Sequence, residues 1–259
     1  MIGLIGYGRF GRLTVTHLAP DGEVVVHTRS TDKAADIARA GGRLVSLEEA
    51  CAQRMVILCV PISAMQATLK SIAPLLAPDT IVADVCSVKV QPAQWMRTLL
   101  PPSVSILATH PMFGPDSAAA SLAGHKIVLC PERIAPQRYQ RITRRLKRKG
   151  LVLIETTPTE HDRKIAVSLA LTHFIGRSLA EFGATPLDID TEGYKRLLHI
   201  LEVVNNDTWQ LFEDMYRYNP YADETRRAYM AAMERIGDRL PAGSSFFIKE
   251  SFHEDASDT

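Results

Sequence analysis

A glycine-rich loop near the start of the chain restricts the possible fold more than any other feature of the sequence. Residues 2–5 read IGLI, and Gly6, Gly8 and Gly11 follow in the spacing G-x-G-x-x-G. The first glycine permits a tight turn, the second lets the backbone approach a pyrophosphate, and the third lets helix and strand pack closely. Because the motif follows an apolar strand and precedes a predicted helix, it indicates a dinucleotide site at a helix N-terminus.

Short runs rich in Val, Ile and Leu recur through the first part of the chain. Longer amphipathic stretches separate several of them, which is typical of a parallel sheet covered by helices on both faces. We therefore predict a doubly wound α/β domain of the Rossmann type over residues 1–155. The runs lie at residues 2–5, 23–27, 55–60, 81–86, 105–110, 126–130 and 151–155.

The pattern changes after residue 155, and no strand signal remains up to Ile236. Residues 159–183 open with a capping pattern, Thr159 followed by Asp162, and close at a glycine, so they predict one long helix. Its interior is apolar nearly all round, which predicts burial at the centre of a second domain. We expect an all-helical domain over residues 156–240 and a flexible tail over 241–259. Further helices are predicted at 193–204, 207–218 and 222–236.

Composition excludes several classes of protein. The 259 residues carry a net charge of +1, so we expect no nucleic-acid or membrane partner, and the basic run 138–149 predicts a solvated helix face. No apolar run reaches transmembrane length, and the chain begins inside its first strand, so we expect no targeting segment. The four cysteines lack CxxC spacing, which favours reduced thiols in a cytoplasmic protein without a metal site.

The end of the second strand distinguishes NAD from NADP. NAD enzymes usually have an Asp or Glu there, about 20 residues after the glycines, to accept from the ribose 2′-hydroxyl. Here the strand ends VVVHTRS, and no carboxylate follows until Asp32. Arg29 is suited to clamp a 2′-phosphate, and Thr28 and Ser30 to donate to it, so we predict NADP rather than NAD. We also assign Arg9, Phe10, Val60 and Pro61 to the cofactor site.

Two segments with polar residues follow apolar strands: DVCSVK at 84–89 and ATHPMFGP at 108–115. Loops at the carboxyl ends of parallel strands carry the ligands in such sheets, so Ser87 and His110 are expected to face the nicotinamide pocket. A histidine with a pKa near neutrality is suited to take a hydroxyl proton as hydride leaves the same carbon. Ser87 would hold that hydroxyl or orient the imidazole. The alternative for His110 is a turn histidine that bonds only backbone.

Five segments, GYGRFG, DVCSVK, THPMFGP, TEHD and LTH, resemble in order and spacing the prephenate/arogenate dehydrogenase family of tyrosine biosynthesis. The resemblance covers about residues 1–235 and is greatest to the short, plant-like arogenate dehydrogenases. It implies hydride transfer to NADP from C4 of a cyclohexadienol, loss of the ring carboxylate as carbon dioxide, and aromatisation. It implies that His110 is the base or hydrogen-bond acceptor, that Ser87 is its partner, and that the chain forms a homodimer through its helical domain.

The resemblance also suggests substrate-binding residues. It places His173, in LTH, at the cleft between domains, although a core histidine is the alternative. Asp207 resembles an acidic position of arogenate-specific members and would favour an ammonium over a ketone; an N-cap is the alternative. Thr191 is a weaker candidate for a substrate carboxylate. We assign His161 a structural or supporting role, since capping explains most of TEHD.

One departure from the family leaves the carboxylate anchor open. Many members carry an arginine six residues after the glycine that corresponds to Gly193, and this chain has His199 there. Lys195, Arg196 and Arg217 are the candidates to replace it, and the sequence selects none of them.

Several alternative functions remain at this stage. Prephenate and 4-amino-4-deoxyprephenate are alternative substrates for the same base and cofactor loop. β-Hydroxyacid dehydrogenases and imine reductases share the domain plan; the former place a lysine on the central helix, but Lys164 lies only one turn from its start. An NADP-sensing regulator would need neither Ser87 nor His110.

Overall fold

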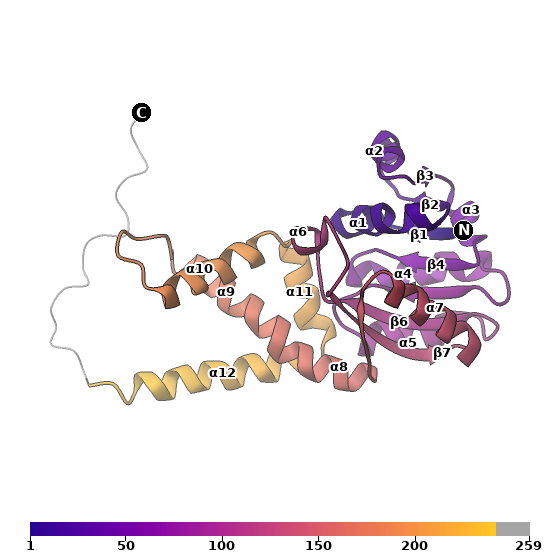
Figure 1. Ribbon diagram of the computed structural model, residues 1–259. Coiled ribbons are helices and arrows are strands. Elements are labelled where there is room, and N and C mark those ends of the chain that lie inside the picture. Colours follow the sequence, from indigo (N-terminus) through magenta and orange to yellow (C-terminus); the bar gives the residue numbers. More distant parts are fainter. Residues whose placement is uncertain (242–259) are drawn as a thin grey trace.

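The computed structural model describes residues 1–241, so all but the first residue of the predicted tail 241–259 lies outside the described residues. The chain forms a sheet-containing half, residues 1–155, and a helical half that begins at Pro158 and extends away from it (Figure 1). No helix of the described residues is long and apolar enough to span a membrane. Within the same residues no cluster of three or more His, Cys, Asp or Glu side chains could hold a metal ion.

Eight strands form one sheet in the order β3-β2-β1-β4-β5-β6-β7-β8. All neighbouring strands are parallel except β6 and β7, which are antiparallel. The predicted α/β fold class is confirmed, with this one reversed pair. The strands are β1 Ile2–Ile5, β2 Val24–His27, β3 Arg43–Leu44, β4 Met55–Leu58, β5 Ile81–Asp84, β6 Ser105–Pro111, β7 Lys126–Arg133 and β8 Val152–Glu155.

The expectation of an all-parallel sheet was wrong at β7, and β3 was missed. A parallel connection needs a crossover, usually a full helix. The segment between β6 and β7 holds only the four-residue helix α6, Pro115–Ala118, so the chain turns back on itself. β3 has two residues, too few to show a strand pattern.

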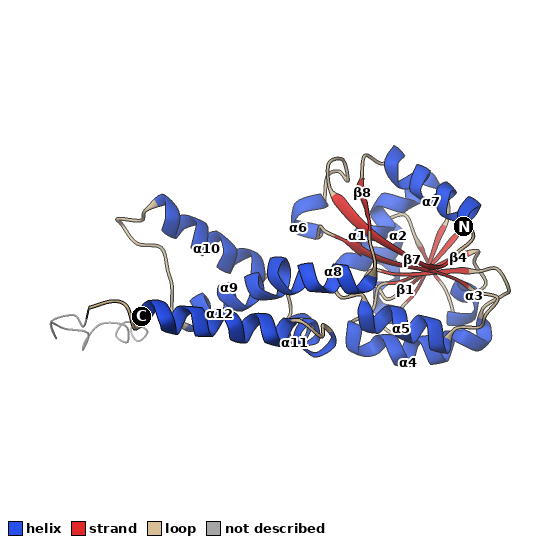
Figure 2. Cartoon of the chain, turned by 90° about the horizontal axis from the view of Figure 1, so that it is seen from below, coloured by secondary structure: helices blue, strands red, loops and turns tan. Residues whose placement is uncertain are grey.

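Helices cover both faces of the sheet, with α4 and α5 on one face and α1 and α7 on the other (Figure 2). The largest cluster of buried apolar side chains lies against α4 and α5 and includes Met65, Leu69 and Met96. The helices are α1 Arg9–Leu18, α2 Ala34–Arg39, α3 Leu47–Cys51, α4 Ile62–Ile72, α5 Val90–Leu99 and α7 Pro136–Arg148, with 3₁₀ turns at Ala19–Asp21, Thr31–Lys33 and Ala73–Leu75.

In the helical half, α8 (Pro158–Ile165) passes through a π-helical segment (Ala166–Ala170) into α9 (Leu171–Glu181). The predicted cap was wrong: Thr157, not Thr159, is the N-cap, and its hydroxyl accepts from the Glu160 backbone N–H at 3.2 Å. The π-helical segment breaks the regular 3.6-residue repeat, so spacing along the whole helix does not give the face of a residue. α10 Glu192–Asn205, α11 Trp209–Tyr218 and α12 Ala222–Gly237 follow.

The long helix is not covered on all sides within residues 1–241. Val167 on the π-helical segment is 55% exposed, and Phe182 at the end of α9 is 76% exposed. Within the described residues, α9 packs mainly against α10. The described residues of the helical half therefore leave part of its apolar surface exposed.

Candidate active site

The helical half docks along the carboxyl edge of the sheet, where the predicted site residues lie. Arg9, at the start of α1, donates to the Asn206 carbonyl at 2.7 Å. Asp214 of α11 accepts from the backbone N–H and hydroxyl of Ser63 at 2.9 and 2.8 Å, which caps the start of α4. These contacts hold α10 and α11 against the ends of β1 and β4.

A buried ion pair fixes the loop that carries Ser87. The Lys89 ammonium contacts the Asp84 carboxylate, with both side chains fully buried, and donates to the Thr109 carbonyl at 2.6 Å. Asp84 also accepts from the Cys86 backbone N–H at 2.9 Å. The loop after β5 is thereby joined to β6, the neighbouring parallel strand that contains His110. Ser87 thus follows β5, and His110 lies near the end of the adjacent strand β6, as predicted.

His110 is buried and its partner is another histidine. Its Nδ1 lies 2.9 Å from Nε2 of His161, and Nδ1 of His161 lies 2.7 Å from Oδ1 of Asp162. Burial is the largest cause that lowers the pKa of His110 well below its ordinary value. The contact excludes the alternative that His110 is a turn histidine bonded only to backbone, because its partner is a side chain. Capping does not explain His161 either, because Thr157 caps the helix.

In the helical half, His173 and Asp207 come together. Nε2 of His173 lies 3.6 Å from Oδ2 of Asp207. Burial, with a contribution from Arg177, lowers the pKa of His173 to about 4, and burial raises the pKa of Asp207. The N-cap of α11 is Thr208, whose hydroxyl accepts from Leu211 N–H at 3.2 Å, so Asp207 is not the cap. Its carboxylate is left to face His173.

Three buried side-chain polar atoms of the described residues have no hydrogen-bond partner: Oγ of Ser87, Nδ1 of His173 and Nε of Arg177. An unsatisfied buried polar group costs about 1–3 kcal/mol, so each one requires an explanation. Two belong to residues that the sequence assigned to substrate or catalysis, and the third lies one helical turn after His173. A bound polar ligand would supply the missing partners.

Arg177 is the residue that the sequence analysis missed. One terminal nitrogen donates to the Asp207 carbonyl at 2.8 Å, and the guanidinium carbon lies 5.1 Å from the ring centres of Trp209 and of Phe212. The signal that could have found it is its position four residues after His173, since such pairs share a helix face. The carboxylate candidates Lys195, Arg196 and Arg217 are all exposed.

Thr191 is not brought to this cluster. It is the N-cap of α10, and its hydroxyl accepts from Tyr194 N–H at 3.2 Å. The cluster lies beyond the other end of α10, and a helix of that length spans about 20 Å. Its assignment to the substrate site is therefore withdrawn.

The glycine loop has the shape that a dinucleotide requires. Gly6 has φ +97°, and a Cβ there would lie 2.3 Å from the Cys59 carbonyl oxygen. A Cβ on Gly11 would lie 2.5 Å from the Gly6 carbonyl oxygen, whereas one on Gly8 would meet nothing within 4 Å. Gly8 is the N-cap of α1 and offers no side-chain cap, so the first N–H groups of the helix face open space. These residues fit a pyrophosphate.

The other predicted cofactor residues surround this loop. Val60 lies beside Gly6, and Pro61 is the N-cap of α4. The Phe10 ring packs near Phe113, with centroids 6.1 Å apart. Arg9 bridges Asn206 and Asp116.

At the end of β2, Arg29 is exposed and makes no ion pair or side-chain hydrogen bond within residues 1–241. Thr28 accepts from Ser30 N–H at 3.4 Å. Asp36 does not take the place of a ribose-binding carboxylate, because it is engaged by Tyr7 at 3.1 Å, Arg12 at 3.3 Å and Arg39 at 3.2 Å.

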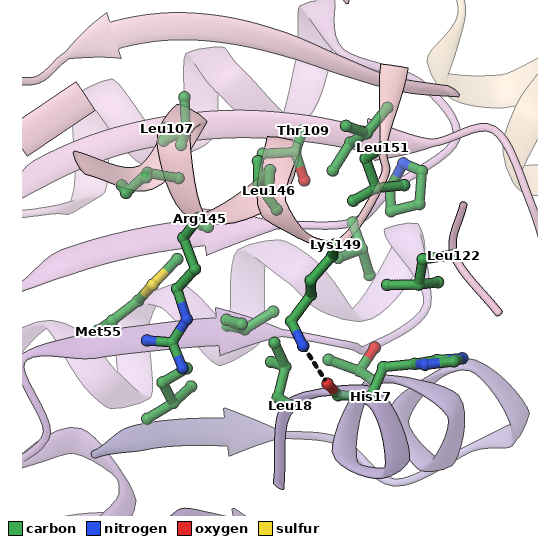
Figure 3. Close-up of a pocket in the computed structure, with 18 of the residues that line it drawn as sticks. His17, Leu18, Met55, Leu107, Thr109, Leu122, Arg145, Leu146, Lys149 and Leu151 are labelled. Carbon is green, nitrogen blue, oxygen red and sulfur yellow. Dashed lines mark hydrogen bonds between the residues drawn. The ribbon is translucent and has the colours of Figure 1, made fainter. Parts of the chain in front are cut away.

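An apolar cavity of about 360 Å³ lies on the opposite face of the sheet from His110, between α1 and α7 (Figure 3). Leu107 and Thr109 of β6 line it, and alternation along a strand turns His110 away from it. Lys149 reaches across and donates to the His17 carbonyl at 2.7 Å. The cavity therefore does not contain the candidate catalytic groups.

Known proteins resemble both halves. The family model described as "Prephenate dehydrogenase, nucleotide-binding domain" matches residues 26–155, and "TYRAAT1-like, C-terminal domain" matches residues 178–246. Arogenate dehydrogenase 2, chloroplastic, of Arabidopsis thaliana is 32% identical over 251 residues, which span 92% of this chain and 69% of the plant protein.

Two solved structures share the fold. Synechocystis arogenate dehydrogenase matches with a TM-score of 0.70 at 21% identity, over 92% of this chain and 90% of the other. Prephenate dehydrogenase from A. aeolicus, in complex with hydroxyphenyl propionate and NAD⁺, matches with a TM-score of 0.71 at 19% identity, over 92% and 87%.

Proposed function

This chain belongs to the prephenate dehydrogenase family, and on that premise we propose that it is an NADP-dependent arogenate dehydrogenase. It converts arogenate to tyrosine by oxidative decarboxylation. The observation that carries the proposal is the unpartnered Oγ of Ser87 on the loop fixed beside the strand of His110, at the same edge of the sheet as a glycine loop that fits a dinucleotide. A hydroxyl-bearing substrate supplies the partner that this oxygen lacks.

The reaction needs a proton acceptor and a group that holds the substrate hydroxyl. The bound nicotinamide supplies the acceptor for the hydride of C4. Ser87 hydrogen-bonds the C4 hydroxyl, and Nε2 of His110 takes its proton as the carbonyl forms. The bond to the ring carboxylate breaks, carbon dioxide leaves, and the ring becomes aromatic. Because aromatisation drives the reaction, the protein mainly positions these groups and polarises the hydroxyl.

The cofactor is held by the backbone of the glycine loop and by the residues that follow β2. Gly6, Gly8 and Gly11 admit the pyrophosphate at the N-terminus of α1. Arg29, exposed and without a protein partner among residues 1–241, clamps the 2′-phosphate of NADP, assisted by Thr28.

Selection of arogenate over prephenate falls to the helical half. The Asp207 carboxylate, 37% exposed and 3.6 Å from His173, receives the ammonium of the arogenate side chain. The same carboxylate repels the more anionic side chain of prephenate. Arg177, with an unpartnered Nε one turn after His173, takes the side-chain carboxylate in place of the arginine that family members carry where this chain has His199.

The exposed apolar side chains of the helical half support a homodimer. Met230, Met233 and Ile236 form a stripe at three-residue spacing on α12, and each is at least 40% exposed. A second copy that packs on this stripe removes apolar surface from water. We place the dimer in the cytoplasm, in agreement with four free cysteines.

A steady-state comparison of arogenate and prephenate, each with NADP and with NAD, tests this proposal. Arogenate with NADP is expected to give the highest kcat/KM, and NADP the lower KM of the two dinucleotides. A higher kcat/KM for prephenate or for 4-amino-4-deoxyprephenate would reassign the substrate. Tight NADP binding without turnover on any cyclohexadienol would contradict the enzymatic function.

A further inference from the structure

We propose that His161 and Asp162 are positioning residues that fix the tautomer of His110, so that its Nε2 presents a lone pair to the substrate hydroxyl. The inference deepens the proposed function, on which it rests, because it names the groups that prepare the base. It follows from a buried chain of hydrogen bonds that runs from His110 through His161 to the N-terminus of α5.

The chain is anchored at Asp162, which can only accept. Its Oδ1 receives the Lys89 backbone N–H at 2.7 Å and its Oδ2 receives the Val90 N–H at 2.8 Å. Both donors lie at the start of α5, where unpaired N–H groups and the helix dipole favour a negative charge. Asp162 is fully buried. Both carboxylate oxygens therefore accept from donors that belong to a different helix from their own.

The direction of each further hydrogen bond follows from this anchor. The nearest atom of His161 to Oδ1 of Asp162 is Nδ1, at 2.7 Å, so Nδ1 must carry the hydrogen. Burial lowers the pKa of His161, so its ring is neutral at ordinary pH and its Nε2 carries a lone pair.

That lone pair lies 2.9 Å from Nδ1 of His110, which must therefore donate. Because His110 is also neutral, Nε2 is left as its free acceptor. The two rings are nearly perpendicular, at 72°, so the in-plane hydrogen of one meets the edge of the other. The network thus selects the one tautomer that can act as a base at Nε2.

The same chain stabilises the charge that forms during reaction. When Nε2 of His110 takes a proton, the new positive charge is shared through Nδ1–H to His161 and then to the Asp162 anion. The other charged groups near His110, Lys89 and Asp84, neutralise each other in a buried pair and do not orient the ring. Asn219 completes the frame, as its side-chain amide donates to the Asp162 carbonyl at 2.9 Å.

Two substitutions separate positioning from packing. Gln at 161 places an amide oxygen where Nε2 lies and keeps an acceptor for His110, whereas Phe keeps the ring but removes the acceptor. His161→Phe should lower kcat by about 10²-fold, which is the lower end of the range for loss of a general base. His161→Gln should recover most of that loss. The KM for NADP stays within about twofold in both. Equal and near-normal kcat in both variants would overturn the proposal.

A second measurement needs neither substrate nor variant. Nitrogen-15 NMR of histidine-labelled wild-type protein reports which ring nitrogen carries hydrogen. We expect His110 protonated at Nδ1 and bare at Nε2, and His161 in the same tautomer. His110 protonated at Nε2 would refute the positioning role. If wild-type protein turns over no cyclohexadienol, the proposed function fails, yet this measurement still decides the tautomer.

Discussion

The two halves of the molecule differ in how they bury apolar side chains. All three clusters of buried apolar residues within the described chain lie in the sheet half. The helical half leaves Phe182 76%, Ile189 88% and Trp209 59% exposed. Within the described residues the sheet half is therefore held by its own core, whereas the helical half packs against the edge of the sheet and leaves large apolar side chains exposed.

Chemistry is divided along the same boundary. The sheet half provides the glycine loop, Ser87 and His110, and the helical half provides His161, His173 and Asp207. In the proposed site each half alone is incomplete, because the proposed base comes from the sheet half and the residues proposed to orient it and to select the substrate come from the helical half. Substitutions in either half should therefore give separable effects.

The largest effect is expected from the base in the sheet half. His110→Asn removes the proton acceptor without a charge change, and kcat should fall by about 10²–10⁴-fold. Cofactor binding should stay intact, because β4 and β5 lie between β6 and β1, the strand that leads into the glycine loop. Stopped-flow or steady-state kinetics and NADP titration give both quantities. His199→Asn, on the exposed face of α10, is the matched control, and a near-normal kcat for His110→Asn would contradict its role.

The next effect tests whether the helical half needs a second copy. Met233→Glu places a charge in the centre of the exposed stripe on α12. Burying an unpaired charge costs about 3–5 kcal/mol, so the dimer dissociation constant should rise by at least about 10²-fold. Analytical ultracentrifugation over a range of concentrations measures it. Val152→Glu, at a 47% exposed site on the edge strand β8, should leave the oligomeric state unchanged. If both variants had the same dimer dissociation constant, the claim that only the helical half forms the dimer contact would be wrong.

A smaller effect concerns substrate choice. Asp207→Asn removes the carboxylate that favours the ammonium, and the ratio of kcat/KM for arogenate to that for prephenate should fall by about tenfold. Thr208→Ala serves as the comparison, because it removes the cap of α11 at a cost of about 1 kcal/mol of unfolding free energy. It should leave the ratio unchanged. An unaltered ratio in Asp207→Asn would mean that the helical half does not select through this carboxylate.

The smallest effect is a loss of stability in acid, centred where the halves meet. The pKa values of His110, His161 and His173 all lie below the ordinary value of 6.5, chiefly because of burial. Below pH 6.5 the unfolded chain binds protons that the folded chain does not, so the free energy of unfolding must fall as pH falls. His173, with its pKa near 4, should contribute about 1 kcal/mol of this loss by pH 5.5. Urea titrations at pH 7.5 and 5.5 measure it.

The variant His173→Asn isolates the contribution of one histidine to this loss of unfolding free energy. With its pKa near 4, His173 stays neutral in the folded state down to that pH. The variant should lose less unfolding free energy between pH 7.5 and 5.5 than the wild type. The same pH dependence in both proteins would show that His173 does not titrate as described.

Much of the sheet half could be predicted from the sequence because its signals are local. Apolar runs and the spacing of Gly6, Gly8 and Gly11 gave the strands and the cofactor loop, and the strand ends pointed to Ser87 and His110. The two-residue β3 could not be predicted, because it exists only through its pairing with β2. The antiparallel direction of β7 could not be predicted either, because it follows from the short connection between β6 and β7.

The helical half was harder because its site depends on contacts distant in sequence. His161 bonds His110 across 51 residues, and Arg177 bonds the Asp207 carbonyl across 30. No spacing rule connects such residues, and the π-helical segment removes the helical periodicity that would relate Asp162 to His173. The assignment of Thr191 came from its place in the turn before a predicted helix, and the structure shows Thr191 as the N-cap of α10, at the end away from Asp207.

A crystal structure of the protein with NADP⁺ and a non-reactive phenol analogue of the substrate tests the central claim most directly, since it shows whether the two halves close one site around the reacting carbon. We predict that the analogue hydroxyl lies within about 3.2 Å of both Nε2 of His110 and Oγ of Ser87, with the nicotinamide against the ring. The side chain of the analogue should lie toward Asp207. An imidazole that faces away from the analogue, beyond the reach of a bridging water, would contradict the account.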